Sequence, residues 1–212
     1  MKINKWLDVT MTIEPNMMVY KNLEAKKPTI ITRANYETHE HYESSISMDM
    51  HTGTHIDMPL HMIKDGETSD TFSLDYVNGK CFVIDLTQIE ENHIEKAHLE
   101  PYEAQINAGE IVILKTKNCL KDEFDFDFVF LAESGAQYLL EQGVKSVGID
   151  ALGIERSQPE HPTHKILLGN HIYIIEGLAL KAIEEGPYKL LCLPIKIANV
   201  EGLPARALLK PL

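Results

Sequence analysis

The segment from His51 to His61 constrains this chain more than any other stretch. It reads HTGTHIDMPLH and places three histidines and one aspartate around a Gly-Thr pair. Neutral imidazole and carboxylate groups are ligands of Zn²⁺ and of its first-row neighbours. The alternative is that these are scattered surface residues of a chain with ten histidines. Their density, together with Gly53 and Pro59, favours a metal site.

The backbone of this segment must bend if His51 and His55 are to bind one ion. A helix is disfavoured because the Thr-Gly-Thr stretch at 52–54 has low helix propensity and Pro59 would break the second turn. An extended strand, at about 3.3 Å per residue, would hold the two histidines roughly 13 Å apart. Glycine tolerates a positive φ and close backbone approach. We therefore expect the chain to leave a strand and turn sharply at Gly53.

Length and composition are those of an ordinary globular protein. With 212 residues, 44% of them hydrophobic and 25% charged, the chain is expected to form one domain, residues 1–212. Its three cysteines are widely spaced, which predicts small buried side chains rather than disulfides. A net charge of −12 argues against nucleic acid as a partner. No apolar run is long enough to span a membrane, and the start, MKINKWLDVT, lacks the apolar core of a signal peptide, so we expect no membrane contact and a cytoplasmic location.

Short β-rich runs recur along the chain and outnumber the helical segments. The predicted strands cover residues 6–13, 29–32, 44–50, 81–86, 111–116, 146–150, 171–176 and 190–197. Helical periodicity is clearest at 133–142, where Ala136, Leu139 and Leu140 fall on one side and Gly143 follows. A shorter helix is expected at 178–185. These elements do not alternate in the steady manner of a doubly wound fold.

The string HTGTHIDMPLH matches the His-x-Gly-Thr-His-x-Asp-x-Pro-x-His signature of the cyclase family, which the chain resembles. That family includes bacterial kynurenine formamidases and isatin hydrolases, which are metal-dependent amide hydrolases. Looser similarity follows the family's order in LDVTMTI, GEIVILKT, LAESGAQYLLEQGVKSVGID, HKILLGNHIYIIEGLAL and LLCLPIKIANVEGLPARALL. The resemblance implies an α/β fold of the swivelling β/β/α type, in which a curved, partly closed mixed sheet carries the site.

One motif supplies too few ligands for two ions, so further ligands are expected elsewhere in the chain. Glu176 ends the apolar run HIYIIE, a position that suits a site at the end of a strand, although a solvated strand terminus is the alternative. Three histidines lie nearby, and nothing intrinsic ranks His161, His164 and His171. The family's pattern, a histidine followed by Glu-x-Leu, aligns on His164 and Glu176.

The resemblance therefore implies two divalent ions per chain. It assigns one ion to His51, His55 and Asp57, and the second to Asp57, His164 and Glu176, so that Asp57 bridges them. Nitrogen and carboxylate ligands without thiolate permit Zn²⁺ or Mn²⁺, and the nitrogen-rich first set favours Zn²⁺.

His61, at the end of the motif, is the expected acid/base residue. Two neighbouring ions can lower the pKa of a shared water and polarise a carbonyl, so that metal-bound hydroxide attacks an amide. Expulsion of the amide nitrogen then needs a proton, which a histidine that titrates near neutral pH can supply. The alternative is that His61 is an additional ligand or a hydrogen-bond partner of one. Thr54 and Asp150 are further expected to orient the histidines.

The substrate region departs from the family's pattern. Kynurenine formamidases carry an aromatic residue followed by Pro-Gly-Asp after the first strand. Here Tyr20 retains the aromatic residue, which is expected to bind substrate, but Lys-Asn-Leu follows it at 21–23. The sequence predicts a metal-dependent hydrolase of a small amide, lactam or aryl formamide, acting as a homodimer or homotetramer. The alternative is a non-hydrolytic metal-binding protein, or a cyclase or lyase acting on another carbonyl compound.

Overall fold

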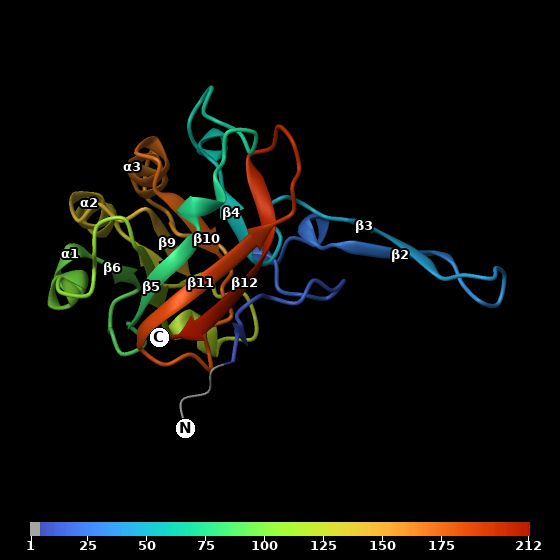
Figure 1. The fold of residues 1–212 in the computed structure, drawn as a ribbon, viewed down its shortest axis with the longest axis horizontal. Coiled ribbons are helices and arrows are strands. Elements are labelled where there is room, and N and C mark those ends of the chain that lie inside the picture. Colours follow the sequence, from blue (N-terminus) through green and yellow to red (C-terminus); the bar gives the residue numbers. More distant parts are fainter. Residues whose placement is uncertain (1–4) are drawn as a thin grey trace.

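The computed structural model describes residues 5–212, and its main feature is a mixed sheet that closes on itself (Figure 1). Residues 1–4, part of the segment considered above for a signal peptide, lie outside the described residues. The strand order is β1 (Leu7–Asp8), β12 (Gly202–Pro211), β11 (Gly186–Pro194), β5 (Asn78–Asp85), β7 (Ile111–Lys115), β9 (Ser146–Ile149), β10 (Tyr173–Glu176) and β4 (His55–Asp57). Because β4 pairs with both β10 and β12, it closes the ring. This confirms the expected α/β fold with a curved mixed sheet.

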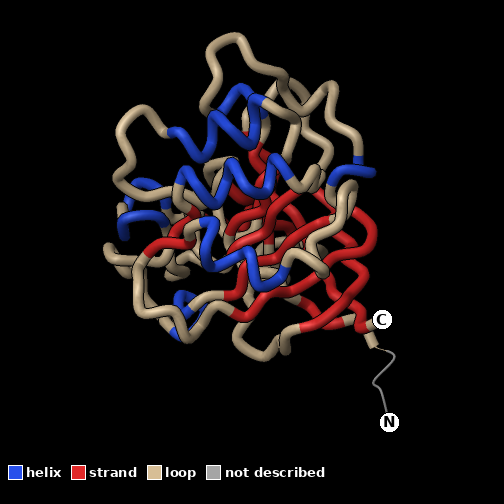
Figure 2. The backbone as a smooth tube through the Cα atoms, turned by 90° about the vertical axis from the view of Figure 1, so that its left-hand side faces the viewer, coloured by secondary structure: helices blue, strands red, loops and turns tan. Residues whose placement is uncertain are grey.

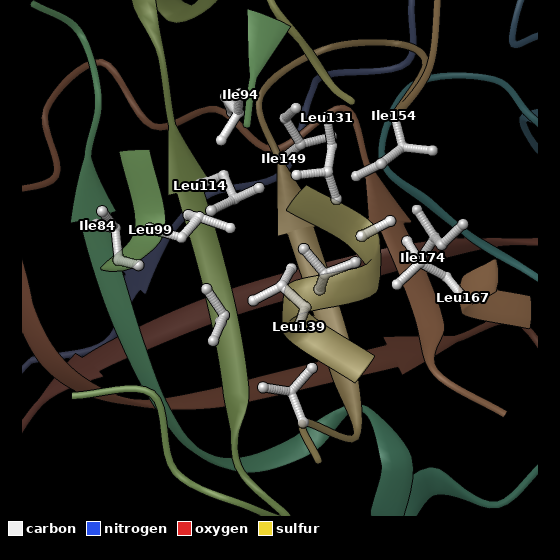
Figure 3. Packing of buried hydrophobic residues seen from close by; sticks show 14 of the residues in the cluster. Ile84, Ile94, Leu99, Leu114, Leu131, Leu139, Ile149, Ile154, Leu167 and Ile174 are labelled. Carbon is white, nitrogen blue, oxygen red and sulfur yellow. The ribbon is translucent and has the colours of Figure 1, made fainter. Parts of the chain in front are cut away.

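The central strands β5, β7, β9 and β10 are parallel and carry side chains that are buried on both faces. Such strands read as continuous apolar runs, as in Ile111–Lys115. Alternate side chains of these strands point into two different cores. Ile111 and Ile113 lie in the inner core, inside the ring, whereas Val112 and Leu114 lie in the outer core, outside it. Figure 3 shows part of this outer core, where side chains of the strands meet those of the helices.

The three α-helices among residues 5–212 lie beside the ring and cover the outer core (Figure 2). They are α1 (Lys96–Leu99), α2 (Glu133–Glu141) and α3 (Pro162–Gly169). The prediction of a helix at 133–142 is confirmed as α2. Ala136 and Leu139 are fully buried, and Leu140 packs at the edge of the outer core.

The sequence interpretation was wrong about two other segments. The predicted helix at 178–185 is not helical. Leu178 and Leu180, two residues apart, both enter the inner core, a spacing that extended chain allows and a helix does not. The helix α3 was missed, although Pro162 occupies its first turn, a favoured place for proline.

The predicted strands at 29–32 and 44–50 form a separate hairpin, β2 (Thr29–Ala34) and β3 (Glu43–Ser47). This hairpin projects away from the body (Figure 1) and leaves Ile30, Ile31 and Ile46 exposed. The strand predicted at 6–13 is regular only at Leu7–Asp8. Residues 93–94 and 130–131 form the short parallel pair β6 (His93–Ile94) and β8 (Phe130–Leu131). Within residues 5–212, no helix is long and apolar enough to cross a membrane.

Helix α3 is held on the sheet by Leu167, which lies in the outer core beside Ile174 of β10 (Figure 3). Because Leu167 is fully buried, we expect Leu167→Ala to lower the free energy of unfolding by about 2–5 kcal/mol. The exposed Lys165 on the same helix is the control. Lys165→Ala should change stability by less than about 0.5 kcal/mol. Denaturant unfolding of both variants measures this, and equal losses would contradict the packing described here.

Candidate metal centre

The motif segment turns as its sequence predicts. After β3 the chain bends through residues 50–54, and Gly53 adopts a φ of +63°. The bend brings the ring centroids of His51 and His55 to within 4.9 Å of each other. The Nδ1 atom of His55 donates to the carbonyl oxygen of Gly53 at 2.8 Å. This hydrogen bond fixes the ring and leaves Nε2 of His55 free to face a metal ion.

The pairing of β4 with β10 determines which side chains face the site. His55 pairs with Glu176 across the two strands, and Asp57 pairs with Ile174. Residues that alternate along a strand share a face, and Ile174 lies in the outer core. His55, Asp57 and Glu176 therefore point out of the ring, towards α3, while Ile56 points into the inner core.

The other four predicted ligands come together around Asp57. One carboxylate oxygen, Oδ1, lies 2.8 Å from Nδ1 of His51 and 3.4 Å from Nε2 of His55. The other, Oδ2, lies 3.9 Å from Nε2 of His164. Glu176 completes the group, with Oε2 at 3.3 Å from Nε2 of His55 and Oε1 at 3.8 Å from Nε2 of His164. The cluster thus joins a loop, two strands and a helix.

Several atoms of this cluster are buried without a hydrogen-bond partner among the described residues. They are Nε2 of His51, Nε2 of His55 and both carboxylate oxygens of Asp57. Burying such groups without a partner is costly, and native proteins rarely do so. A divalent cation removes this cost because each of these atoms is a donor to Zn²⁺ or Mn²⁺. The residues present therefore fit a divalent metal.

The histidines and carboxylates of the cluster stabilise one another in their charged forms. Burial alone would lower the pKa of His55, but contacts with Asp57 and Glu176 outweigh burial and raise its pKa to about 10. The pKa of His164 is likewise raised to about 10 against burial, by Glu155 and Glu176. Burial would raise the pKa of Asp57, yet its histidine neighbours hold it well below its usual range. Protons on the histidines thus balance the buried carboxylates, and a metal ion must displace these protons to bind.

His61 lies against the same cluster, at the end of a short 3₁₀ turn (Pro59–His61). Its ring centroid is 4.0 Å from that of His51 and 5.7 Å from that of His164. Burial lowers the pKa of His61, which keeps the ring neutral near pH 7. Nitrogen and oxygen atoms of His51, Asp57 and His61 also lie within 4.8 Å of one another. The geometry therefore accommodates both roles considered for His61, proton transfer and ligation.

Sequence reasoning missed Glu155, which is buried beside His164. Its Oε2 atom lies 2.7 Å from Nδ1 of His164 and also accepts the backbone N–H of that residue. A carboxylate in this place fixes the ring so that Nε2 faces Asp57. Glu155 lies in a loop that no motif marks, so its role becomes visible only when α3 is placed.

The expectation that Thr54 and Asp150 orient the histidines was wrong. The hydroxyl of Thr54 donates to the carbonyl of Gly177 at 2.6 Å and accepts the backbone N–H of Met11. Asp150 accepts hydrogen bonds from the backbone N–H and hydroxyl of Thr116. Both residues fasten loops around the site instead of contacting its imidazoles.

The cluster opens into a cavity of 390 Å³, a size typical of small-molecule sites. Tyr20 lines this cavity, as expected, and is fixed by an edge-to-face contact with Phe124 at 5.2 Å between ring centroids. Met62 and Leu152 add apolar surface. The cavity therefore combines a polar side, formed by the histidines and carboxylates of the cluster, with an aromatic and apolar wall.

Comparison with known proteins identifies the family. The family model described as "Putative cyclase" matches residues 7–156, which include the motif and the closing strand β4. The chain belongs to the cyclase family. This confirms the resemblance recognised in the motif.

Several known proteins are similar to this chain over most of its length. A kynurenine formamidase from Erythrobacter litoralis (strain HTCC2594) is 33% identical over 79% of this chain and 76% of its own length. The solved structure of a potential metal-dependent hydrolase with cyclase activity is 44% identical, with a TM-score of 0.89 over 97% of this chain and 96% of its own. Isatin hydrolase A from Labrenzia aggregata is 21% identical, with a TM-score of 0.84 over 98% of this chain and 93% of its own, and shows that the fold is shared.

The end of β10 and the motif loop at residues 51–54 approach so closely that only glycine fits at position 177. A Cβ atom there would clash with the carbonyl oxygen of Gly53, the group that accepts the hydrogen bond from His55. We expect Gly177→Ala to cost about 3 kcal/mol of stability or more and to lower the metal content of the purified protein.

Gly109→Ala is a matched control for this substitution. Gly109 has a similar positive φ, +74°, but no atom lies within 4 Å of the position of its Cβ, whereas Gly177 has a φ of +66° and the contact with Gly53. Gly109→Ala should cost about 1–2 kcal/mol, the cost of the left-handed backbone alone, and leave metal content unchanged. Denaturant unfolding and elemental analysis measure both. Equal losses of stability and metal in the two variants would show that the contact with Gly53 is unimportant.

Proposed function

We propose that this chain is a metal-dependent hydrolase of a small amide, lactam or aryl formamide. The observation that carries the proposal is the cluster of buried, unpartnered nitrogen and oxygen atoms around Asp57, which opens into a small-molecule cavity beside His61. Membership of the cyclase family supports it. The relative from Erythrobacter litoralis, a kynurenine formamidase, supports an aryl formamide as the substrate class.

In this proposal the cluster would hold two divalent ions. The residues that would hold them are His51, His55, Asp57, His164 and Glu176. Zn²⁺ is the preferred ion and Mn²⁺ an acceptable one, because the set is rich in imidazole nitrogen and has no thiolate. When bound, such ions lower the pKa of water towards neutrality and polarise a carbonyl oxygen.

His61 carries the proton chemistry. Because burial keeps its ring neutral, His61 can accept a proton as water attacks the carbonyl carbon and a C–O bond forms. The C–N bond then breaks only if the nitrogen is protonated, since an amide anion is a poor leaving group. His61 returns its proton to that nitrogen, which departs as a neutral amine. Tyr20 and Leu152 support the flat part of the substrate along the apolar wall.

The reverse reaction, closure of a ring at a carbonyl, is a second candidate for the same site. The observation that favours it is the 44% identity with a structure described as a potential metal-dependent hydrolase with cyclase activity. Formanilide cannot cyclise, so its hydrolysis separates the two functions.

The proposal is tested by assaying the protein, loaded with Zn²⁺ or Mn²⁺, on formanilide, isatin and a small lactone. We expect hydrolysis of at least one amide or lactam, its loss on treatment with a chelator, and its recovery when the metal is restored. A metal-loaded protein that cleaves none of them would contradict the proposed function.

The role of His61 is tested by His61→Ala on a matched amide and ester, formanilide and phenyl formate. One positioned acid/base group is typically worth about 10²–10⁴-fold in rate, and we expect a loss of that size for formanilide. Phenolate leaves with less protonation, so the ester should lose less. Bound metal should remain, as measured by elemental analysis.

His171→Ala is the control, because His171 is exposed and does not line the cavity. It should leave both reactions unchanged. If His61→Ala empties the metal site, or slows amide and ester equally, His61 is a ligand or a positioning group rather than the acid.

A further inference from the structure

Residues 20–26 form part of the wall of the cavity beside the metal-binding cluster. This segment contains two short 3₁₀ turns, Tyr20–Asn22 and Glu24–Lys26. Besides Tyr20, it contributes Lys21, Leu23 and Lys26 to the lining. This is the segment in which the chain departs from the family's pattern, so it can give this protein a specificity of its own.

Lys21 has an unfavourable backbone conformation for its residue type. Its φ is +58°, and the following residue, Asn22, has a φ of +51°. Asparagine tolerates this left-handed region, and glycine adopts it most readily, whereas a lysine there is uncommon. The Nζ atom of Lys21 lies 5.3 Å from the centre of the Tyr20 ring, close enough for a cation–π contact. The turn therefore places an ammonium group beside the aromatic wall at a position where glycine would be less strained.

The ammonium group of Lys21 lies over the Tyr20 ring but has no ion-pair partner among the described residues. Within residues 5–212 no carboxylate lies within ion-pair distance of it, whereas Lys26 pairs with Asp49 at 3.4 Å. The two acidic residues of the lining are already engaged. Glu155 contacts His164, and Glu176 accepts the backbone N–H of Ile154 and contacts two histidines of the cluster.

This distribution of charge selects among substrates. A negatively charged group on the substrate finds an unpaired cation at Lys21, whereas an ammonium group finds no free carboxylate among the lining residues. The apolar side chains of Leu23, Met62 and Leu152 suit a ring or short hydrocarbon between this charge and the metal-binding cluster.

We propose that the substrate is an anionic amide or lactam whose acidic group, such as a carboxylate, binds Lys21 while its scissile carbonyl faces the metal-binding cluster. This inference rests on the proposed function and narrows it. Lys21 is a specificity residue: it takes no part in bond breaking, and its effect is on the binding of charged substrates.

The test compares 2-, 3- and 4-formamidobenzoate with formanilide, which lacks the carboxylate. For the metal-loaded wild type, we expect kcat/KM for at least one isomer to exceed that for formanilide about tenfold, the effect of one charge-assisted contact. Lys21→Met should reduce this ratio to near one, mainly through KM. Lys21→Arg should retain most of it, and Lys189→Met, which removes an exposed lysine of β11, should leave it unchanged.

Lys21→Gly guards against an effect of misfolding, because glycine adopts the left-handed backbone without strain. It should melt at or above the wild-type temperature and still lose the preference for the carboxylate. A ratio that stays the same in Lys21→Met and Lys21→Gly, or a wild type that favours formanilide over every isomer, would overturn the proposal.

A binding measurement separates this proposal from the proposed function. If the loaded wild type cleaves no amide, the hydrolase proposal fails, and calorimetry with 3-aminobenzoate and aniline then tests the anion site directly. Lys21→Met should weaken binding of 3-aminobenzoate about tenfold relative to aniline. Equal affinities in wild type and variant would mean that the carboxylate binds elsewhere, for instance at the metal ions, and would refute the role of Lys21.

Discussion

The burial of Asp57 is the constraint on which the rest of this structure depends. Asp57 lies in β4, the strand that closes the ring, and its two carboxylate oxygens are buried without a hydrogen-bond partner among residues 5–212. Such a carboxylate is tolerable only beside compensating positive charge. The histidines around it supply that charge as protons, and a metal ion would supply it more directly. The same residue therefore takes part in closing the ring and in forming the candidate metal site.

The alternation of side chains along β4 links the closure of the ring to the candidate metal site. Ile56 fills the inner core, while His55 and Asp57 on either side of it face outwards to Glu176 and α3. A shift of one residue in the register would place the two polar side chains inside the ring and the isoleucine in the site. The turn at Gly53 sets this register, because the carbonyl of Gly53 accepts a hydrogen bond from the ring of His55, the first residue of β4.

Sequence reasoning predicted the parts of the site that are local in the chain. The turn within the motif followed from Gly53 and from the distance that a straight strand would impose, and the structure shows that turn. The position of Glu176 at the end of an apolar run already suggested a site at a strand end. His164 could be assigned only through family resemblance, because nothing local distinguishes it from His161 or His171. The contact of Glu155 with His164 could not be predicted from the sequence, since it forms only when buried residues elsewhere in the chain hold α3 on the sheet. The prediction of a helix at 178–185 was wrong because packing in the inner core, rather than local helix propensity, determines the conformation of that segment.

We expect the cluster around Asp57 to bind divalent metal in exchange for protons. Calorimetric titration of metal-free protein with Zn²⁺, in buffers of different ionisation enthalpy, tests it most directly. The pKa values of His55 and His164 are raised to about 10 in the metal-free cluster. Both rings are therefore positively charged at pH 7, and each must release one proton when its nitrogen binds a metal ion. We predict uptake of two ions per chain with release of protons at pH 7, and an affinity that falls as the pH is lowered. Two results would contradict this account: the wild type takes up no Zn²⁺, or it takes up Zn²⁺ without releasing protons and His55→Ala takes up the same amount.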